Sequence, residues 1–260
     1  MNDLTLIPTG IPKLDKIIGC FRSSRLIVLA AGFSMGKTAF ALDLARSFAI
    51  DRNIPVLYFS LEESAQEIIQ RLIVAIGKVD SWDLRQMTPE ERRTCAQVAE
   101  TQSRIESAPL FIEDKQRNIS DICAKARRFK ERYPNLGLII VDDLQKFSRD
   151  IPVETRAGEI SKISGILKNL AQDLEVPVLA LAQLSSLMLS QAKRKPILSD
   201  LNMWSGTIEQ HADMVIFIYR FIHENCLVDT KTEIIVAKSI DGPTGVAAMQ
   251  FIEKYLSFTV

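Results

Sequence analysis

The sequence predicts a three-layer α/β domain with a mostly parallel central sheet and an antiparallel hairpin at its C-terminal end. Short apolar runs alternate with segments of helical periodicity along most of the chain, which is typical of that architecture. A phosphate-loop pattern stands between the first core strand and a helix. Near the C-terminus, residues 233–238 and 246–252 instead indicate two strands joined across a turn that contains glycine and proline.

The composition is that of an ordinary globular chain. The 260 residues are 47% hydrophobic and 25% charged, with 32 Lys and Arg against 32 Asp and Glu. This length suits one large domain, which we expect over residues 1–260. A protein that binds nucleic acid usually has more Lys and Arg than Asp and Glu. Any nucleic-acid surface is therefore expected to be local, or to be assembled from several subunits.

Nothing in the sequence predicts export or membrane insertion. The first residues form no basic segment followed by an apolar stretch, and no apolar run approaches membrane-spanning length. The four cysteines (Cys20, Cys95, Cys123 and Cys226) form no C-x-x-C pair, so we expect reduced thiols. The expected protein is soluble and cytoplasmic, with no membrane partner.

The phosphate-loop pattern covers residues 31–38 and predicts a site for a nucleoside triphosphate. It follows the apolar run 26–30 and precedes a segment of good helix formers that begins at Ala39. The backbone N–H groups of such a loop and the helix N-terminus together form an anion site. Lys37 then reaches the β- and γ-phosphates, and the Thr38 hydroxyl is a ligand for Mg²⁺. The strand–loop–helix context argues against a chance Gly-Lys-Thr.

Acidic residues follow two of the predicted strands. Glu62 comes just after strand 56–60, where it is placed to activate water. Alternatively, Glu62 and Glu63 complement the dipole of the next helix, and the spacing does not decide between these roles. Asp142 ends the apolar run 136–141 in the form of a Walker B strand, which favours Mg²⁺ binding over a simple acidic turn.

A polar amide follows another buried strand. Gln183 caps the apolar run 176–182, where it either senses the γ-phosphate or is an ordinary turn residue. Sites in parallel sheets gather at the carboxyl ends of the strands. The side chains expected to converge there are Lys37, Glu62, Asp142 and Gln183. This convergence is stronger evidence for a site than any one motif.

After the predicted strand at 176–182, the hydrophobic periodicity becomes weak. Residues 185–206 show no clear periodicity and contain the basic cluster Lys193, Arg194 and Lys195. We expect a long and mobile surface segment here.

With these positions marked, the chain resembles the RecA-like P-loop motor domain of the DnaB-family replicative DNA helicases. The resemblance runs nearly from end to end, and KaiC- and RadA-like relatives fit less well. The matching stretches include Ser34-Met35-Gly36-Lys37-Thr38, Phe59-Ser60-Leu61-Glu62, Asp142-Asp143-Leu144-Gln145, Ala182-Gln183-Leu184 and Gly242-Pro243-Thr244-Gly245.

The resemblance implies ATP and Mg²⁺ as ligands, and a hexameric ring that moves on single-stranded DNA. Glu62 is then the catalytic base, Asp142 the Walker B acid and Gln183 the γ-phosphate sensor. Arg220 is implied as a contact to the nucleotide base, and Lys37 as the second catalytic residue. The implied cofactor-binding set is Ala31, Gly32, Phe33, Ser34, Met35, Gly36, Lys37, Thr38, Ala39, Asp142, Gln183 and Arg220, with Thr38 and Asp142 at the metal.

The chain departs from the family at positions that work between subunits and on DNA. Ile240 stands where the family has an arginine that reaches the neighbouring subunit's ATP site. Asn202-Met203-Trp204 replaces the Arg-Glu of a DNA-contacting loop, and Asp143 replaces a tyrosine. Almost nothing precedes Thr9, so we expect no N-terminal collar domain or linker helix.

Two functions remain open. The first, narrowly favoured, is a compact DnaB-like helicase motor; the second is a DnaB-like ATP-binding accessory protein of replication or recombination that does not unwind DNA. The expected partners are single-stranded DNA, other replication proteins, and either further copies of the chain or a partner that completes a ring. DNA binding is expected to be weak and to involve Lys193, Arg194, Lys195 and Trp204. Trp204 either stacks on a base or is an ordinary packing residue.

Overall fold

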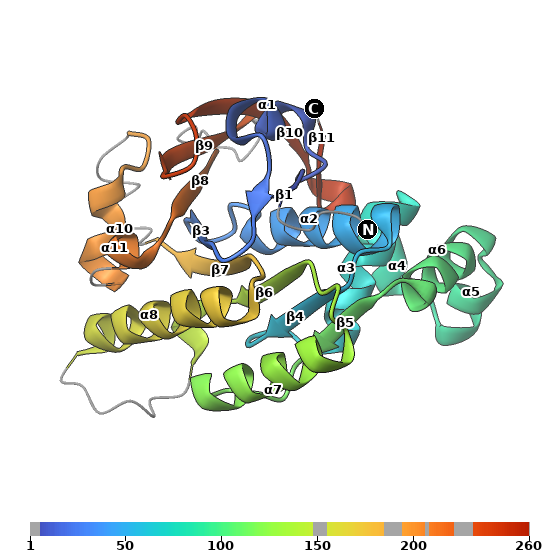
Figure 1. The fold of residues 1–260 in the computed structure, drawn as a ribbon. Helices are drawn as coiled ribbons and strands as arrows, with labels where there is room; N and C mark the ends of the chain where they lie inside the picture. The colour runs from blue at the N-terminus through green and yellow to red at the C-terminus, as the bar shows by residue number, and fades with distance from the viewer. Residues whose placement is uncertain (1–5, 148–154, 185–193, 206–207, 221–230, 260) are drawn as a thin grey trace.

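The computed structural model describes residues 6–147, 155–184, 194–205, 208–220 and 231–259, with only the backbone at 202–205. These residues form a nine-stranded sheet in the order β11-β10-β9-β8-β3-β7-β6-β4-β5 and a small sheet of β1 and β2 (Figure 1). The strands are β1 (Leu6–Ile7), β2 (Phe21–Arg22), β3 (Leu26–Ala31), β4 (Val56–Ser60), β5 (Leu110–Glu113), β6 (Leu138–Asp142), β7 (Val178–Gln183), β8 (Met214–Arg220), β9 (Lys231–Ser239), β10 (Gly245–Ile252) and β11 (Ser257–Thr259).

Helices cover both faces of the large sheet, which confirms the three-layer α/β prediction (Figure 1). The helices are α1 (Pro12–Ile18), α2 (Lys37–Arg52), α3 (Ala65–Gly77), α4 (Ser81–Gln86), α5 (Pro89–Thr94), α6 (Ala96–Ser107), α7 (Ile119–Arg132), α8 (Arg156–Leu174), α10 (Leu198–Ser205) and α11 (Ile208–His211), with 3₁₀ turns η1 (Leu144–Lys146) and η2 (Glu253–Tyr255).

The central strand β3 separates two apolar cores. Every side chain of β3 is buried, as expected for a parallel strand with helices on both faces. Ile27 and Leu29 pack into the core that includes α1, α2 and α3. Leu26 and Val28 point the opposite way, into the core with α7 and α8.

The register of the parallel strands aligns their carboxyl ends. Ala31 of β3 lies opposite Gln183 of β7, and Ser60 of β4 lies opposite Asp142 of β6. The backbone N–H of Leu61 also donates to the carbonyl of Asp142, at 2.6 Å. The segments that follow β3, β4, β6 and β7 therefore begin at one edge of the sheet.

The antiparallel part is larger than the predicted hairpin. β9 and β10 pair antiparallel as expected, but β8 also pairs antiparallel with β9, and β11 adds a further strand beside β10. The three-residue strand β11 gave no alternating pattern long enough to be recognised in the sequence.

The expectation of a loose surface segment at 185–206 is wrong for its C-terminal part. Residues 185–193 lie outside the described residues, but Leu198–Ser205 forms α10, which packs against α8. Leu201 is buried there, and the carboxylate of Asp200 accepts the backbone N–H of Ile197 at 2.8 Å. These contacts are long-range or capping interactions, which a search for hydrophobic periodicity does not detect.

Cys20, Cys95 and Cys123 are free thiols, and Cys226 lies outside the described residues. In the part of the chain that the structure describes, no helix combines the length and the apolar character that crossing a membrane requires.

A buried carboxylate joins α2 to the last strand. Asp43 accepts the backbone N–H of Phe258 at 2.9 Å and is 5% exposed. Burial raises the pKa of Asp43 from 3.8 to about 6, more than the hydrogen bond from Phe258 lowers it. At neutral pH the folded chain therefore carries a charge that its surroundings disfavour.

We predict that Asp43→Asn removes a pH-dependent loss of stability. A folded-state pKa above the unfolded value means that the wild-type chain loses free energy of unfolding as pH rises through about 6. Relative to Asp43→Asn, the wild type should lose about 3 kcal/mol between roughly pH 4 and pH 8. Urea denaturation across this range measures the difference. Asp83→Asn, at an exposed position of α4, is the control; a pH-independent difference for Asp43→Asn would contradict the prediction.

Candidate nucleotide-binding site

A cavity of about 570 Å³ opens at the carboxyl edge of the sheet. The phosphate loop and the first residues of α2 form one wall, because residues 32–39 all line the cavity. Ala31, the last residue of β3, is fully buried and does not line it. The other lining residues are Glu62, Glu63, Arg71, Arg85, Asp143, Gln183, Arg220, Phe251, Glu253 and Leu256.

The loop needs glycine at its last position before α2. Gly36 has φ +91°, a left-handed conformation that side chains rarely adopt, and a Cβ there would lie 2.9 Å from the Phe258 ring. The Phe40 N–H donates to the Gly36 carbonyl at 2.9 Å, so α2 starts directly from the loop. Its N-terminal N–H groups are therefore available to an anion in the cavity.

Lys37 is paired with Asp143, the residue that replaces the family's tyrosine. Its Nζ lies 2.8 Å from Oδ2 of Asp143, and the two side chains are 11% and 3% exposed. Oδ1 of Asp143 accepts the backbone N–H of Gln145 at 3.0 Å, which fixes the carboxylate in place. The ammonium expected to bind phosphate thus already has an anionic partner.

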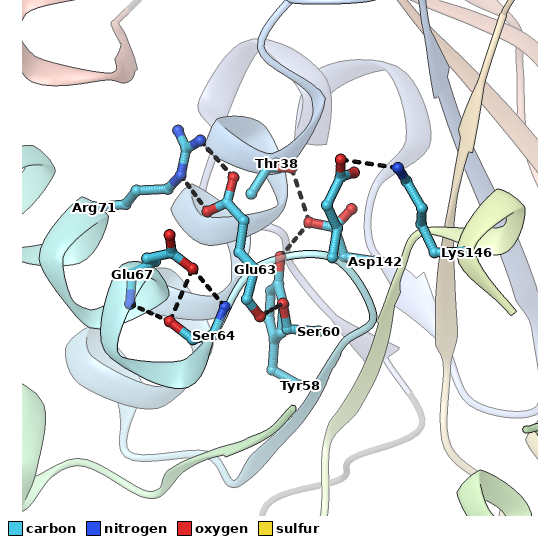
Figure 2. A network of polar contacts seen from close by, with 10 residues as sticks. Thr38, Tyr58, Ser60, Glu63, Ser64, Glu67, Arg71, Asp142 and Lys146 are labelled. Carbon is cyan, nitrogen blue, oxygen red and sulfur yellow. Dashed lines mark hydrogen bonds and ion pairs between the residues drawn. The ribbon is translucent and has the colours of Figure 1, made fainter. Parts of the chain in front are cut away.

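The carboxylate of Asp142 lies beside the Thr38 hydroxyl (Figure 2). Thr38 Oγ1 donates to Oδ2 of Asp142 at 2.8 Å, and the hydroxyl of Tyr58 donates to the same oxygen at 2.7 Å. Burial raises the pKa of Asp142, although the hydrogen bond from Tyr58 and the charge of Lys37 oppose this. Burial also raises the pKa of Tyr58, which keeps its hydroxyl protonated.

The Thr38–Asp142 pair fits Mg²⁺, which prefers oxygen ligands and is usually held by one or two protein groups plus substrate phosphates. Within the described residues, no group of three or more His, Cys, Asp or Glu side chains is arranged to hold a metal by itself. A metal at this position would therefore need phosphate oxygens and water to complete its ligand set.

Glu62 lines the cavity and is not one of the residues that complement the dipole of α3. The N-cap of α3 is Ser64, and the first-turn carboxylate is Glu67, whose side chain accepts the Ser64 N–H at 2.7 Å (Figure 2). Glu62 pairs instead with Lys146 of η1 at 3.0 Å, with both side chains well exposed. Of the two roles that the sequence left open for Glu62, this geometry favours a role at the cavity over stabilisation of the α3 dipole.

Two arginines that line the cavity, Arg71 and Arg85, were not singled out by the sequence reasoning. Glu63 holds Arg71 of α3 in a two-pronged ion pair, with N···O distances of 2.6 and 2.5 Å (Figure 2). Arg85 of α4 also lines the cavity and has no ion pair among the described residues. No local motif marks these arginines, because they come from helices whose place beside the loop is set by tertiary packing.

Gln183 and Arg220 both reach the cavity, as the resemblance implied. The Gln183 N–H donates to Oε1 of Gln145 at 3.0 Å, and Nε2 of Gln145 donates back to the Gln183 carbonyl at 3.2 Å. The buried Arg220 guanidinium lies 4.8 Å from the Phe251 ring centre and pairs with Glu253 at 2.8 Å. The guanidinium therefore lies over the face of the Phe251 ring as a cation–π pair at the cavity.

Of the expected DNA-contacting residues, Arg194 and Lys195 do not line this cavity. Arg194 pairs with Asp200 at 2.7 Å, and Lys195 pairs with Glu233 at 2.6 Å, so neighbouring carboxylates balance both charges. Lys193 and the side chain of Trp204 lie outside the described residues.

Comparisons with known proteins agree on one family. The profile of the DnaB-like helicase C-terminal domain matches residues 7–260. The replicative DNA helicase DnaB of Geobacillus stearothermophilus is 40% identical over 99% of this chain, which spans 57% of that protein's length. A solved structure described as an ATPase domain superposes with a TM-score of 0.88 at 32% identity, covering 99% of this chain and 92% of the other. A DnaB-like replicative helicase, solved in a study of its interactions with primase, gives the same TM-score and identity over 99% of this chain and 62% of the other.

We predict that Asp143→Asn tightens nucleotide binding. The Asp143 carboxylate competes with phosphate for the Lys37 ammonium and repels phosphate itself, whereas asparagine keeps the acceptor for the Gln145 N–H. The dissociation constant of ADP should fall by roughly tenfold, the equivalent of about 1.4 kcal/mol. Isothermal titration calorimetry measures it. Asp173→Asn, which breaks an exposed ion pair between α7 and α8, is the matched control. An unchanged or weaker affinity in Asp143→Asn would show that the carboxylate does not compete with phosphate.

Proposed function

Because this chain belongs to the DnaB-like helicase C-terminal domain family, we propose that it binds and hydrolyses ATP and couples turnover to movement on single-stranded DNA. The observation that carries this proposal is the meeting of the phosphate loop, Asp142 and Glu62 at one edge of the sheet. A cytoplasmic setting is part of the proposal.

In this proposal the loop N–H groups and Lys37 bind the phosphate chain. Thr38 and Asp142 would hold Mg²⁺, which when bound neutralises charge on the β- and γ-phosphates. Glu62 accepts the proton of the attacking water, as a carboxylate general base does. The amide of Gln183 donates to the γ-phosphate, and Arg220 contacts the base. The wider set of nucleotide contacts extends over the loop from Gly32 to Ala39, without the buried Ala31.

We propose further that single-stranded DNA is bound through 193–195 and Trp204, and that other replication proteins are partners. The DnaB-like helicase of similar structure was studied for its interactions with primase, which makes that class a reasonable partner. The ion pairs of Arg194 and Lys195 support weak binding, because a phosphate must compete with Asp200 and Glu233. Assembly into a ring, from copies of the chain or with a partner, belongs to the same proposal.

One observation favours the second function, an ATP-binding accessory protein without unwinding. Ile240, at the position where the resemblance expects a cation, is apolar and 53% exposed. Lys238 on the same edge donates its ammonium to the Glu209 carbonyl at 2.6 Å. A neighbouring subunit would then receive no cation from Ile240, and turnover would be slow.

We predict that two single substitutions separate ATP binding from hydrolysis. Lys37→Ala should weaken ATP binding at least about tenfold, because the phosphate chain loses its ammonium. Glu62→Gln should keep the affinity and lower turnover by roughly 10²–10⁴, because an amide cannot accept the proton. Nucleotide titration and phosphate release measure the two effects. Lys162→Ala, at an exposed position of α8, is the control. Equal ATP affinity in wild type and Lys37→Ala would contradict the assignment of Lys37 as a phosphate ligand.

We predict that single-stranded DNA binds in a strongly salt-dependent way. With two or three phosphate contacts the log–log salt slope is about −2, so affinity should fall roughly tenfold between about 50 and 200 mM salt. Neutralising Lys193, Arg194 and Lys195 together should flatten this slope, whereas Arg127→Ala on α7 should not. Fluorescence anisotropy of a labelled oligonucleotide gives the slopes. DNA that binds without stimulating the ATPase, or does not bind, would favour the accessory function over the motor.

A further inference from the structure

Tyr58 is a buried phenol in the middle of a strand that is otherwise apolar up to Ser60. Its side chain is fully buried, as are those of its neighbours Leu57 and Phe59. Phenylalanine would fill nearly the same space without burying a hydroxyl. A buried phenol is costly unless it finds a hydrogen-bond partner, so the role of this residue lies in the bond its hydroxyl makes.

The partner of that hydroxyl is set by the register of β4 and β6. Tyr58 lies opposite Ile140, and Ser60 lies opposite Asp142, so Tyr58 and Asp142 are diagonal neighbours on one face of the sheet. The ring reaches along the sheet toward the carboxyl edge, and its hydroxyl donates to Oδ2 of Asp142 at 2.7 Å (Figure 2).

The same carboxylate oxygen also accepts the Thr38 hydroxyl. Thr38 Oγ1 lies 2.8 Å from Oδ2, so two donors from different elements converge on one oxygen. Oδ1 of Asp142 has no hydrogen-bond partner among the described residues. Two donors on one oxygen restrict rotation of the carboxylate, which leaves the other oxygen free to bind a further group.

We propose that Tyr58 is a positioning residue for the metal site, where its hydroxyl holds the Asp142 carboxylate in the orientation that binds Mg²⁺. This inference rests on the proposed nucleotide site and adds a residue that the sequence reasoning did not single out. Hydrogen-bond partners of metal-binding carboxylates typically change metal affinity by about 10–100-fold when they are removed. Tyr58 itself does not touch the metal or the nucleotide.

The test is the Mg²⁺ dependence of nucleotide binding in Tyr58→Phe. The probe is N-methylanthraniloyl-ADP, whose fluorescence is followed first in EDTA and then during a Mg²⁺ titration of the whole chain. Tyr58→Phe should bind the metal-free probe within about twofold of wild type, since the loop and Lys37 are unchanged. The Mg²⁺ concentration at half-effect should rise by at least about tenfold. Tyr133→Phe, in the aromatic cluster with Phe111 and Phe129, is the control and should match wild type.

A double variant separates positioning from a packing role. If Tyr58 acts through the Asp142 carboxylate, adding Tyr58→Phe to Asp142→Asn should shift the Mg²⁺ half-effect by less than about twofold. An equal Mg²⁺ half-effect in wild type and Tyr58→Phe would overturn the inference alone. Loss of metal-free binding in Tyr58→Phe, or failure of that variant to fold, would also overturn it, by showing that the hydroxyl holds the fold. A wild-type chain that bound no probe in either condition would overturn the proposed function, and this inference with it.

Discussion

The hydrogen bonds to one oxygen of Asp142 join the elements that must meet for nucleotide chemistry. Oδ2 ties β6 to the first residues of α2 through Thr38 and to β4 through Tyr58. A slip of β6 by one residue would turn Asp142 to the opposite face of the sheet and break both bonds. The slip is opposed because the buried side chains of β6 pack closely on both faces of the sheet and would no longer fit their neighbours. The precision of the site therefore derives from the packing of a strand that is apolar up to its last residue.

The charges around the cavity are balanced within the chain. Lys37, Arg71 and Arg220 each pair with a carboxylate, at 2.8, 2.5 and 2.8 Å. Arg85 is the cavity cation with no such partner in the described part of the chain. A polyphosphate that enters this cavity must compete with these carboxylates or bring a cation with it. The arrangement therefore favours a nucleotide that arrives with its metal over a bare anion.

The sequence allowed the fold and the loop to be predicted because their determinants are local. Buried strands, the loop glycines and the carboxylate that ends β6 leave short patterns, and α5 begins at a similar local signal, with Thr88 as N-cap and proline at its first position. Contacts between distant segments leave no such pattern. The partner of Lys37 lies 106 residues away, and that of Tyr58 lies 84 residues away. Both pairings depend on strand order, which periodicity does not specify.

The edge that carries Ile240 combines a fixed backbone with an exposed apolar side chain. The backbone there is well fixed, since the Ile240 N–H donates to the Asp213 carbonyl at 3.0 Å and Arg25 holds Asp241 with two hydrogen bonds at 2.7 and 2.8 Å. The turn thus presents the side chain at position 240 to solvent, and only the charge that the resemblance expects is lacking. In well-studied phosphoryl transfer, an arginine supplied to the γ-phosphate contributes roughly 10³–10⁵ in rate. A motor built from this chain would have to obtain that cation from another residue or a partner, or else turn over slowly.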